Sequence, residues 1–241
     1  MIFPVKAPFT VSADMTKYEG SAFNHQPDKF YLQQKNIELG KYGHQLCATM
    51  PGSNLFIQQL GNFCGFENTD DIQSIACHLE EDVAVLHQGN LVSICFCFPS
   101  GFIPAEKLGM NFFDMHVPVA DGNVLRAASE KVSKLISREG SAFRRYVWTI
   151  TSLSGLSQHP DYIRPTPNGI SDLYFRTETQ TTVGLGNDVC LFFVKVEMNP
   201  LSIFWQDPDK REKILASINS MSDAVLTYKN LTGIKKILQR V

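Results

Sequence analysis

One histidine stands in an unusual setting, within the stretch CFPSGFIPAEKLGMNFFDMHVPV at residues 97–119. An imidazole that projects into an apolar pocket offers one nitrogen donor to an iron held in a hydrophobic macrocycle, which is what a noncovalent haem requires. A hydrogen-bonded core histidine would have the same signature, so spacing alone leaves both roles open for His116. Its apolar neighbours are Phe112, Phe113, Met115, Val117 and Val119.

Two arginines alternate with large aromatic residues in FRRYVWTIT, residues 143–151. On a strand, Arg144, Tyr146 and Trp148 share one face, whereas Arg145 takes the other. An arginine beside aromatic rings can donate paired hydrogen bonds to a carboxylate or phosphate, such as a haem propionate or an anionic substrate. A solvated arginine beside core aromatic residues is the plain alternative.

A polar stripe runs along YFRTETQTTV, residues 174–183. Alternation puts Arg176, Glu178 and Gln180 on one face of a strand, and this face is directed either to water or to a polar cavity. In a partly buried pocket, the Glu178 carboxylate could hold an amine cation or move a proton.

Three helices are predicted upstream of and between the strand candidates. The first falls in QPDKFYLQQKNIELGKYG, residues 26–43, where Pro27 fits a first helical turn. The second falls in GSNLFIQQLGNFCGF, residues 52–66, with Ser53 or Asn54 as its cap. The third falls in GNVLRAASEKVSKLISREG and ends at Gly140.

The strand candidates do not alternate with helices, so the pattern predicts an α+β fold. A hairpin is expected in residues 81–98, turning at Gln88–Asn90, and three further strands in residues 143–151, 171–183 and 188–198. Residues 154–170 are too rich in proline and glycine to be regular. We therefore expect an antiparallel sheet of five or more strands flanked by helices. The chain, 1–241, is expected to be a single domain with an N-terminal arm (1–20) and C-terminal helices (208–241).

The composition argues against several classes of protein. A formal charge of −2 with 19% charged residues provides no basic footprint for nucleic acid. No signal peptide or membrane span is expected, because two prolines interrupt the opening and no apolar run approaches about 18 residues. A cytoplasmic location and six reduced cysteines follow as expectations. The phosphate-binding, dinucleotide-binding, hydrolase-elbow and zinc-helix motifs are missing, so we expect no flavin or nicotinamide site.

Several blocks of the sequence, taken together, resemble a known family. They are EEDVAVLHQGNLVSICFCFPSGFIPAEKLGMNFFDMHVPVADG, FRRYVWTITS and FRTETQTTVGLGNDVCLFFVKVEMNPL. In this order and spacing they are similar to the haem-dependent oxidative N-demethylase family, specifically its haem-binding alpha subunit. The similarity covers about residues 25–205, and its most specific part is the C-F-P-S, K-L-G and H-x-P-V block.

The resemblance implies a fold, an activity and partners. The fold would be PAS-like, an antiparallel sheet flanked by helices around a noncovalent haem b. The activity would be a monooxygenase reaction that takes a small secondary amine such as dimethylamine, consumes O2 and releases formaldehyde. Electrons would come from NADPH through a flavin and an iron–sulfur centre on a separate reductase subunit. The sequence leaves open whether the chain forms a homo-oligomer.

The resemblance also implies roles for individual residues. His116 would be the axial ligand of the haem iron, and Lys107, Arg144 and Arg145 would bind the propionates, with Trp148 also at the cofactor. Glu178 would be the catalytic residue that recognises the amine, beside Gln180, Thr181 and Tyr146.

The chain departs from the family pattern at three places. Val147 replaces an asparagine, Thr179 replaces an arginine, and Gly186 replaces a proline. These departures bear on the substrate more than on the fold or the haem. Two alternatives therefore stay open: a haem-binding PAS-like sensor of gas or redox state without turnover, and a haem-free module that binds a small molecule or a partner.

Overall fold

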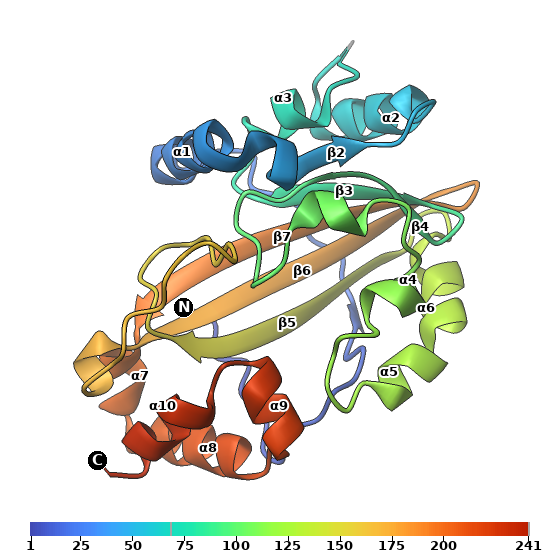
Figure 1. Cartoon of the computed structure of the whole chain (residues 1–241). Helices are drawn as coiled ribbons and strands as arrows, with labels where there is room; N and C mark the ends of the chain where they lie inside the picture. Colours follow the sequence, from blue (N-terminus) through green and yellow to red (C-terminus); the bar gives the residue numbers. More distant parts are fainter. Residues whose placement is uncertain (68, 241) are drawn as a thin grey trace.

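The fold is built on one antiparallel sheet. The computed structural model describes residues 1–67 and 69–240, and within these ranges seven strands pair in the order β1-β5-β6-β7-β3-β4-β2 (Figure 1). This confirms the predicted α+β class with an antiparallel sheet of five or more strands. The strands are β1 (Thr16–Lys17), β2 (Cys47–Thr49), β3 (Asp82–His87), β4 (Asn90–Cys95), β5 (Ala142–Thr151), β6 (Tyr174–Gly186) and β7 (Val189–Pro200).

The predicted hairpin is confirmed as β3 and β4, which turn through Gln88 and Gly89. Both residues have positive φ, at 51° and 76°, as a two-residue turn between twisted strands requires. The three other predicted strands are β5, β6 and β7. They pair with one another over almost their whole lengths, and β6 forms the centre of this group.

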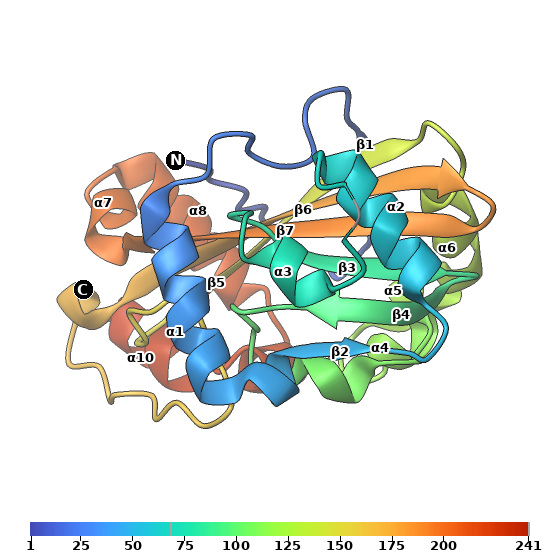
Figure 2. The same cartoon turned by 90° about the horizontal axis from the view of Figure 1, so that it is seen from above.

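The first three helices cover one face of the sheet. They are α1 (Lys29–Leu46), α2 (Asn54–Cys64) and α3 (Ile72–Ala76), and they lie over β3, β4 and β7 (Figure 2). Asp28 caps α1 by accepting a hydrogen bond from the Phe30 amide, so Pro27 precedes the helix instead of opening it. Buried apolar side chains join this layer to the sheet: Ile57, Leu60, Ile75, Leu79, Val83, Val85, Leu191 and Phe193.

The other helices surround the opposite face and the ends of the sheet (Figure 1). The helix predicted in residues 122–140 is divided at Ala128 into α5 (Asn123–Ala127) and α6 (Ser129–Ile136), and the short α4 (Phe112–Met115) precedes them. Helix α6 packs through Val132 and Ile136 on Leu86, Phe143 and Cys190 of the sheet. The connecting segments contain two 3-10 helices, η1 (Pro104–Lys107) and η2 (Ile170–Asp172).

The C-terminal helices form a second core with the N-terminal arm. They are α7 (Leu201–Trp205), which sequence reasoning missed, and the predicted α8 (Pro208–Asn219), α9 (Asp223–Tyr228) and α10 (Thr232–Leu238). Phe3 of the arm stacks on both Phe175 and Phe204, and Val5 is buried in the same cluster. Both ends of the chain are therefore packed against β5 and β6. Within the described ranges, no helix is both long and apolar enough to cross a membrane.

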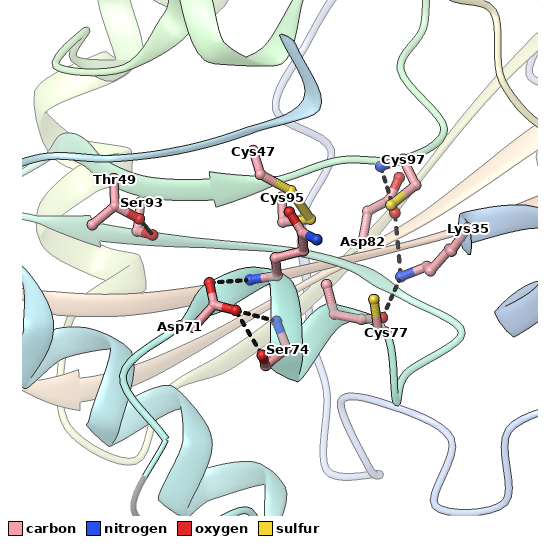
Figure 3. Close-up of a disulfide and its surroundings, with 12 residues drawn as sticks. Lys35, Cys47, Thr49, Asp71, Ser74, Cys77, Asp82, Ser93, Cys95 and Cys97 are labelled. Carbon is pink, nitrogen blue, oxygen red and sulfur yellow. Dashed lines mark hydrogen bonds and ion pairs between the residues drawn. A yellow bond between two sulfur atoms is a disulfide. The ribbon is translucent and has the colours of Figure 1, made fainter. Parts of the chain in front are cut away.

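The cysteines differ from the sequence-based expectation. Cys47 of β2 and Cys95 of β4 form a disulfide, so the expectation of six reduced thiols is wrong for this pair (Figure 3). The physical reason is register, because the two residues lie directly opposite each other on neighbouring strands with a Cα–Cα distance of 4.2 Å. Cys64, Cys77, Cys97 and Cys190 are free, and Cys97 is fully buried.

A buried ion pair fixes the end of β4 relative to α1 (Figure 3). Lys35 and Asp82 are almost inaccessible to solvent, and Lys35 Nζ lies 3.3 Å from Asp82 Oδ1. The Asp82 carboxylate also accepts hydrogen bonds from the amides of Cys97 and Phe98, at 3.0 and 2.8 Å. Because Phe98 enters the wall of the cavity described next, this pair positions part of that wall.

Candidate functional site

A large cavity lies on the face of the sheet opposite α1–α3. Its volume is about 880 Å³, within the range of cofactor and ligand sites. The floor consists of inward-facing residues of β3 to β7, and the walls come from the arm, the segment after β4, helices α4–α6, the loop before β6 and helices α9 and α10. The apolar part of the lining includes Ala84, Leu86, Leu91, Ile94, Phe96, Phe98, Phe112, Met115, Val132, Ile136, Phe143, Phe192 and Val194.

His116 lines this cavity from the C-terminal end of α4. Asn111 caps α4 by accepting a hydrogen bond from the Asp114 amide, and this single turn places the imidazole beside the helix start. His116 Nδ1 lies 2.6 Å from the Phe112 carbonyl oxygen, and the two rings stack with centroids 4.1 Å apart. Only a protonated Nδ1 can donate to a carbonyl, so Nε2 is the nitrogen with a free lone pair.

The charge state of His116 suits a ligand nitrogen. Burial lowers the pKa of the imidazole, and the nearby Arg145 guanidinium acts in the same direction against the Phe112 hydrogen bond. The side chain is therefore neutral at neutral pH. A neutral imidazole whose Nδ1–H is bonded to a backbone carbonyl is the usual form of a metal-ligating histidine.

Arg126 of α5 holds the backbone that follows His116. Its Nη1 donates to the carbonyl oxygens of His116 at 3.3 Å and Val119 at 3.1 Å, and its Nη2 bonds the Asn123 side chain. Gly122 lies against this guanidinium, since a Cβ there would be 3.0 Å from Arg126 Nη1 and 2.9 Å from the Val119 carbonyl oxygen. Sequence reasoning did not identify Arg126, which no motif distinguishes from a surface arginine.

The polar stripe on β6 faces the cavity, so the first of its two predicted environments, water, does not apply. The Glu178 side chain is only 12% exposed and bonds Arg176 Nη1 through one oxygen, while Gln180 Nε2 donates to the other at 2.8 Å. Burial alone would raise the pKa of this carboxyl, but Arg176 outweighs it and holds the pKa below the ordinary value. Glu178 is thus a buried, ionised carboxylate on the cavity floor.

Two further cations border the cavity. Arg145 faces it from β5, and among the described residues no partner reaches its buried Nε. Lys229, at the end of α9, donates to the Trp148 carbonyl oxygen at 2.8 Å. Burial lowers the pKa of Lys229 to about 8, although Glu178 attracts its charged form. Three cationic groups, Arg145, Arg176 and Lys229, therefore lie near the Glu178 carboxylate.

The strand register decides which predicted residues enter the cavity. Arg145 pairs with Gln180, and Val147 with Glu178, so Arg145 shares the face of the polar stripe. Arg144 takes the other face as predicted, which removes it from the cavity. Its guanidinium stacks 3.4 Å over the Tyr18 ring, and its Nε donates to Thr181 at 3.0 Å. Thr181, its partner, is likewise absent from the cavity lining, which includes the remaining predicted residues: His116, Lys107, Arg145, Tyr146, Trp148, Glu178 and Gln180.

Two of these residues contribute in a different way from the rest. The Trp148 ring is buried on the opposite face of the sheet, where it stacks on Phe175 with ring centroids 5.6 Å apart. At the cavity, Trp148 contributes its backbone carbonyl, which accepts the hydrogen bond from Lys229. Tyr146 has the same parity and is 41% exposed. Sequence reasoning placed Arg176 in the polar stripe but missed it as the partner of Glu178. It also missed Lys229 and Arg164, because the segments that contain these two residues carry no motif.

A comparison with protein families places this geometry in context. Residues 27–239 match the family described as haem-dependent oxidative N-demethylase, alpha subunit-like. The chain belongs to this family. No curated protein is similar enough to count as a match. The haem-dependent oxidative N-demethylase resemblance seen in the sequence is thereby confirmed, and the match extends beyond the resembling blocks into the C-terminal helices.

The residues present fit the haem that the family description implies. The cavity combines an apolar wall, a neutral histidine with one free ring nitrogen and buried cationic groups. Several buried polar atoms on its floor have no partner among the described residues, including Arg145 Nε, Thr149 Oγ1 and Thr182 Oγ1. Buried polar groups normally have hydrogen-bond partners, so these atoms indicate a polar ligand in addition to apolar contacts.

Proposed function

We propose that this protein is the haem-binding subunit of an oxidative N-demethylase-like monooxygenase that acts on a small secondary amine such as dimethylamine. With haem b bound noncovalently, the reaction takes the amine, O2, two electrons and two protons to the primary amine, formaldehyde and water. The electrons come from a separate NADPH-dependent reductase with flavin and iron–sulfur centres. The PAS-like fold that the resemblance implies stays a prediction.

The observation that carries this proposal is the environment of His116. Its side chain lines the cavity, its Nε2 has no hydrogen-bond partner among the described residues, and its Nδ1–H donates to the Phe112 carbonyl. That hydrogen bond fixes the tautomer and the ring orientation and increases the basicity of Nε2 toward iron. When bound, haem supplies the iron that activates dioxygen. Lys107 and Arg145 donate to the propionates, while the aromatic wall excludes water from the macrocycle.

Glu178 recognises the substrate in this proposal. Its carboxylate is ionised at neutral pH and accepts a hydrogen bond from the protonated amine, as an addition to those from Arg176 and Gln180. Holding the nitrogen at a fixed point directs one N-methyl group to the reacting centre, which is the positioning contribution to catalysis. Tyr146 and Trp148 stay predicted contacts of the substrate and the cofactor.

Haem reconstitution tests the ligand assignment. Wild-type protein mixed with haem is expected to develop a Soret band, and His116→Gly is expected to lose its ligation and regain it when free imidazole is added. His44→Ala is the matched control, because His44 is exposed on α1 and outside the cavity. No Soret band in wild type would refute the haem proposal. An unchanged spectrum in His116→Gly would refute the ligand assignment.

Turnover tests the enzyme proposal. Formaldehyde release from dimethylamine, with a supplied reductant and O2, is expected from the haem-loaded protein. Glu178→Gln is expected to weaken amine binding while leaving the haem spectrum nearly intact, since Glu178 holds the substrate and not the haem in this proposal. Haem reduction and oxygen binding without formaldehyde would instead favour a sensor. Unchanged amine affinity in Glu178→Gln would exclude Glu178 from the substrate site.

A further inference from the structure

A second polar region of the cavity lies beyond Glu178, where the loop before β6 meets the segment after β4. Arg164 and Gln158 of this loop line the cavity together with Ser100. Arg164 Nη2 donates to Gln158 Oε1 at 3.2 Å, and residues 100 and 158 form a backbone bridge. We refer to Arg164, Gln158 and Ser100 as the Arg164 region. These three residues take no part in the proposed binding of the haem or the amine.

Gln158 is the best-defined group of this region. Its side chain is 3% exposed, and its Oε1 accepts hydrogen bonds from Thr151 Oγ1 at 3.1 Å and from Arg164. These two bonds identify Oε1 as the acceptor of the amide and fix its orientation, so Nε2 is the donor. Nε2 is buried and has no hydrogen-bond partner among the described residues. A buried amide donor without an acceptor is costly, so this position favours a ligand that supplies an oxygen.

The electrostatics of the region favour an anion. Arg164 takes part in none of the ion pairs among the described residues. Burial, together with the nearby Arg176 cation, lowers the pKa of Arg164 and so disfavours its charged form. A bound anion would stabilise that charged form. Glu178 is paired with Arg176, and no ion pair among the described residues joins it to Arg164.

We propose that Arg164 and Gln158 Nε2 form a carboxylate-binding subsite of the cavity. The Arg164 guanidinium and the Gln158 amide lie next to each other on the cavity lining, and together they offer N–H donors to a planar, two-oxygen anion. A carboxylate can reach this point from two sources, a haem propionate or the substrate itself. The second source rests on the proposed function and would make the substrate an N-methylated amino acid, with its ammonium on Glu178 and its carboxylate on Arg164.

The spacing of groups permits that second arrangement. Arg176 Nη1 contacts Glu178 and also lies 3.3 Å from Ser100 Oγ, and residue 100 bridges to residue 158. Arg176 and Ser100 thus connect Glu178, which would hold the substrate ammonium, with Gln158, which would hold the substrate carboxylate. Both charges of one small zwitterion would then be bound in neighbouring parts of the same cavity.

Metal-free porphyrin tests the first source without any contribution from iron ligation. The full chain is titrated with protoporphyrin IX and with its dimethyl ester, followed by fluorescence. If a propionate occupies the subsite, Arg164→Gln and Gln158→Glu each weaken protoporphyrin IX binding by about tenfold or more but leave ester binding unchanged. Gln158→Glu retains the oxygen that accepts from Thr151 and replaces only the donor. Arg138→Gln, on an exposed arginine outside the cavity, is the control.

Calorimetry with N-methylglycine and dimethylamine tests the second source. If the substrate carboxylate occupies the subsite, both variants lose N-methylglycine affinity by about tenfold or more and keep dimethylamine affinity. The proposal is overturned if neither variant changes the affinity for protoporphyrin IX or for N-methylglycine relative to Arg138→Gln. That result is separate from failure of the proposed function, which is decided by the Soret band and by His116→Gly.

Discussion

Replacing Arg176 with methionine removes the cation that keeps Glu178 ionised on the cavity floor. Arg176 is 2% exposed and donates to the Phe98 carbonyl at 2.8 Å, to Leu156 at 3.4 Å and to the Glu178 carboxylate. Methionine retains most of the apolar stem but none of these donors. The variant therefore leaves a buried carboxylate and two backbone carbonyls without their partner.

The expected loss at pH 7 is about 3–5 kcal/mol of unfolding free energy, the usual cost of removing one member of a buried ion pair. The loss depends on pH with a defined sign. In wild type, Arg176 lowers the pKa of Glu178 in the folded state. The stability that the ionised Glu178 contributes is therefore complete above about pH 4.3, the pKa of the unfolded chain, and declines as the pH falls through the folded-state pKa. In Arg176→Met, burial raises that pKa, so the penalty is present above about pH 4.3 and disappears below it.

Urea unfolding at a series of pH values measures the difference between the two proteins. The difference should be largest near pH 7, shrink as the pH falls toward about 4.3 while Glu178 of the variant becomes protonated, and shrink further below it. At pH 7, adding Glu178→Gln to Arg176→Met should recover part of the loss, because the buried charge is removed. A difference below about 1 kcal/mol at pH 7, or one that is constant with pH, would refute this account of the pair.

Three further predictions concern groups at and behind the cavity wall. Lys229 has a folded-state pKa of about 8. Wild-type stability should therefore rise, relative to Lys229→Met, between about pH 8 and the unfolded value near 10.4; parallel curves from urea titrations would contradict this. Lys35→Met should cost about 3–5 kcal/mol of unfolding free energy because it strands the Asp82 charge, and Lys35→Met with Asp82→Asn should recover part of it; no recovery would exclude the charge as the cause. Thiol labelling of the non-reduced, denatured chain should modify four of the six cysteines, and labelling of Cys47 or Cys95 would contradict the disulfide.

Much of the fold was predictable because it depends on local patterns. The Gln88–Gly89 turn, the alternation in β5 and β6 and the tail helices each follow from a few neighbouring residues. The break between α5 and α6 was not predictable, because apolar periodicity continues across Ala128. The disulfide was missed for another reason. Its partners are 48 positions apart, and only strand register brings them together.

The site was predictable where one strand or one motif supplies the residues. Parity alone separated Arg144 from Arg145, and the structure placed only Arg145 at the cavity. Which face would be the cavity face could not be read from parity. Lys229 lies at the end of a short helix and Arg164 in an irregular loop, and the sequence of neither segment indicates a binding site. Their importance arises from burial next to other charges, a property of the packed molecule.

The cavity wall joins segments from both ends of the sequence, from Pro4 in the arm to Ile237 in α10. During synthesis, the strands of the floor emerge long before the last helices that close the cavity over them. The cavity is therefore complete only after α10 has left the ribosome. Insertion of any cofactor that depends on all of its walls is then a late event, which follows translation of the domain instead of guiding it.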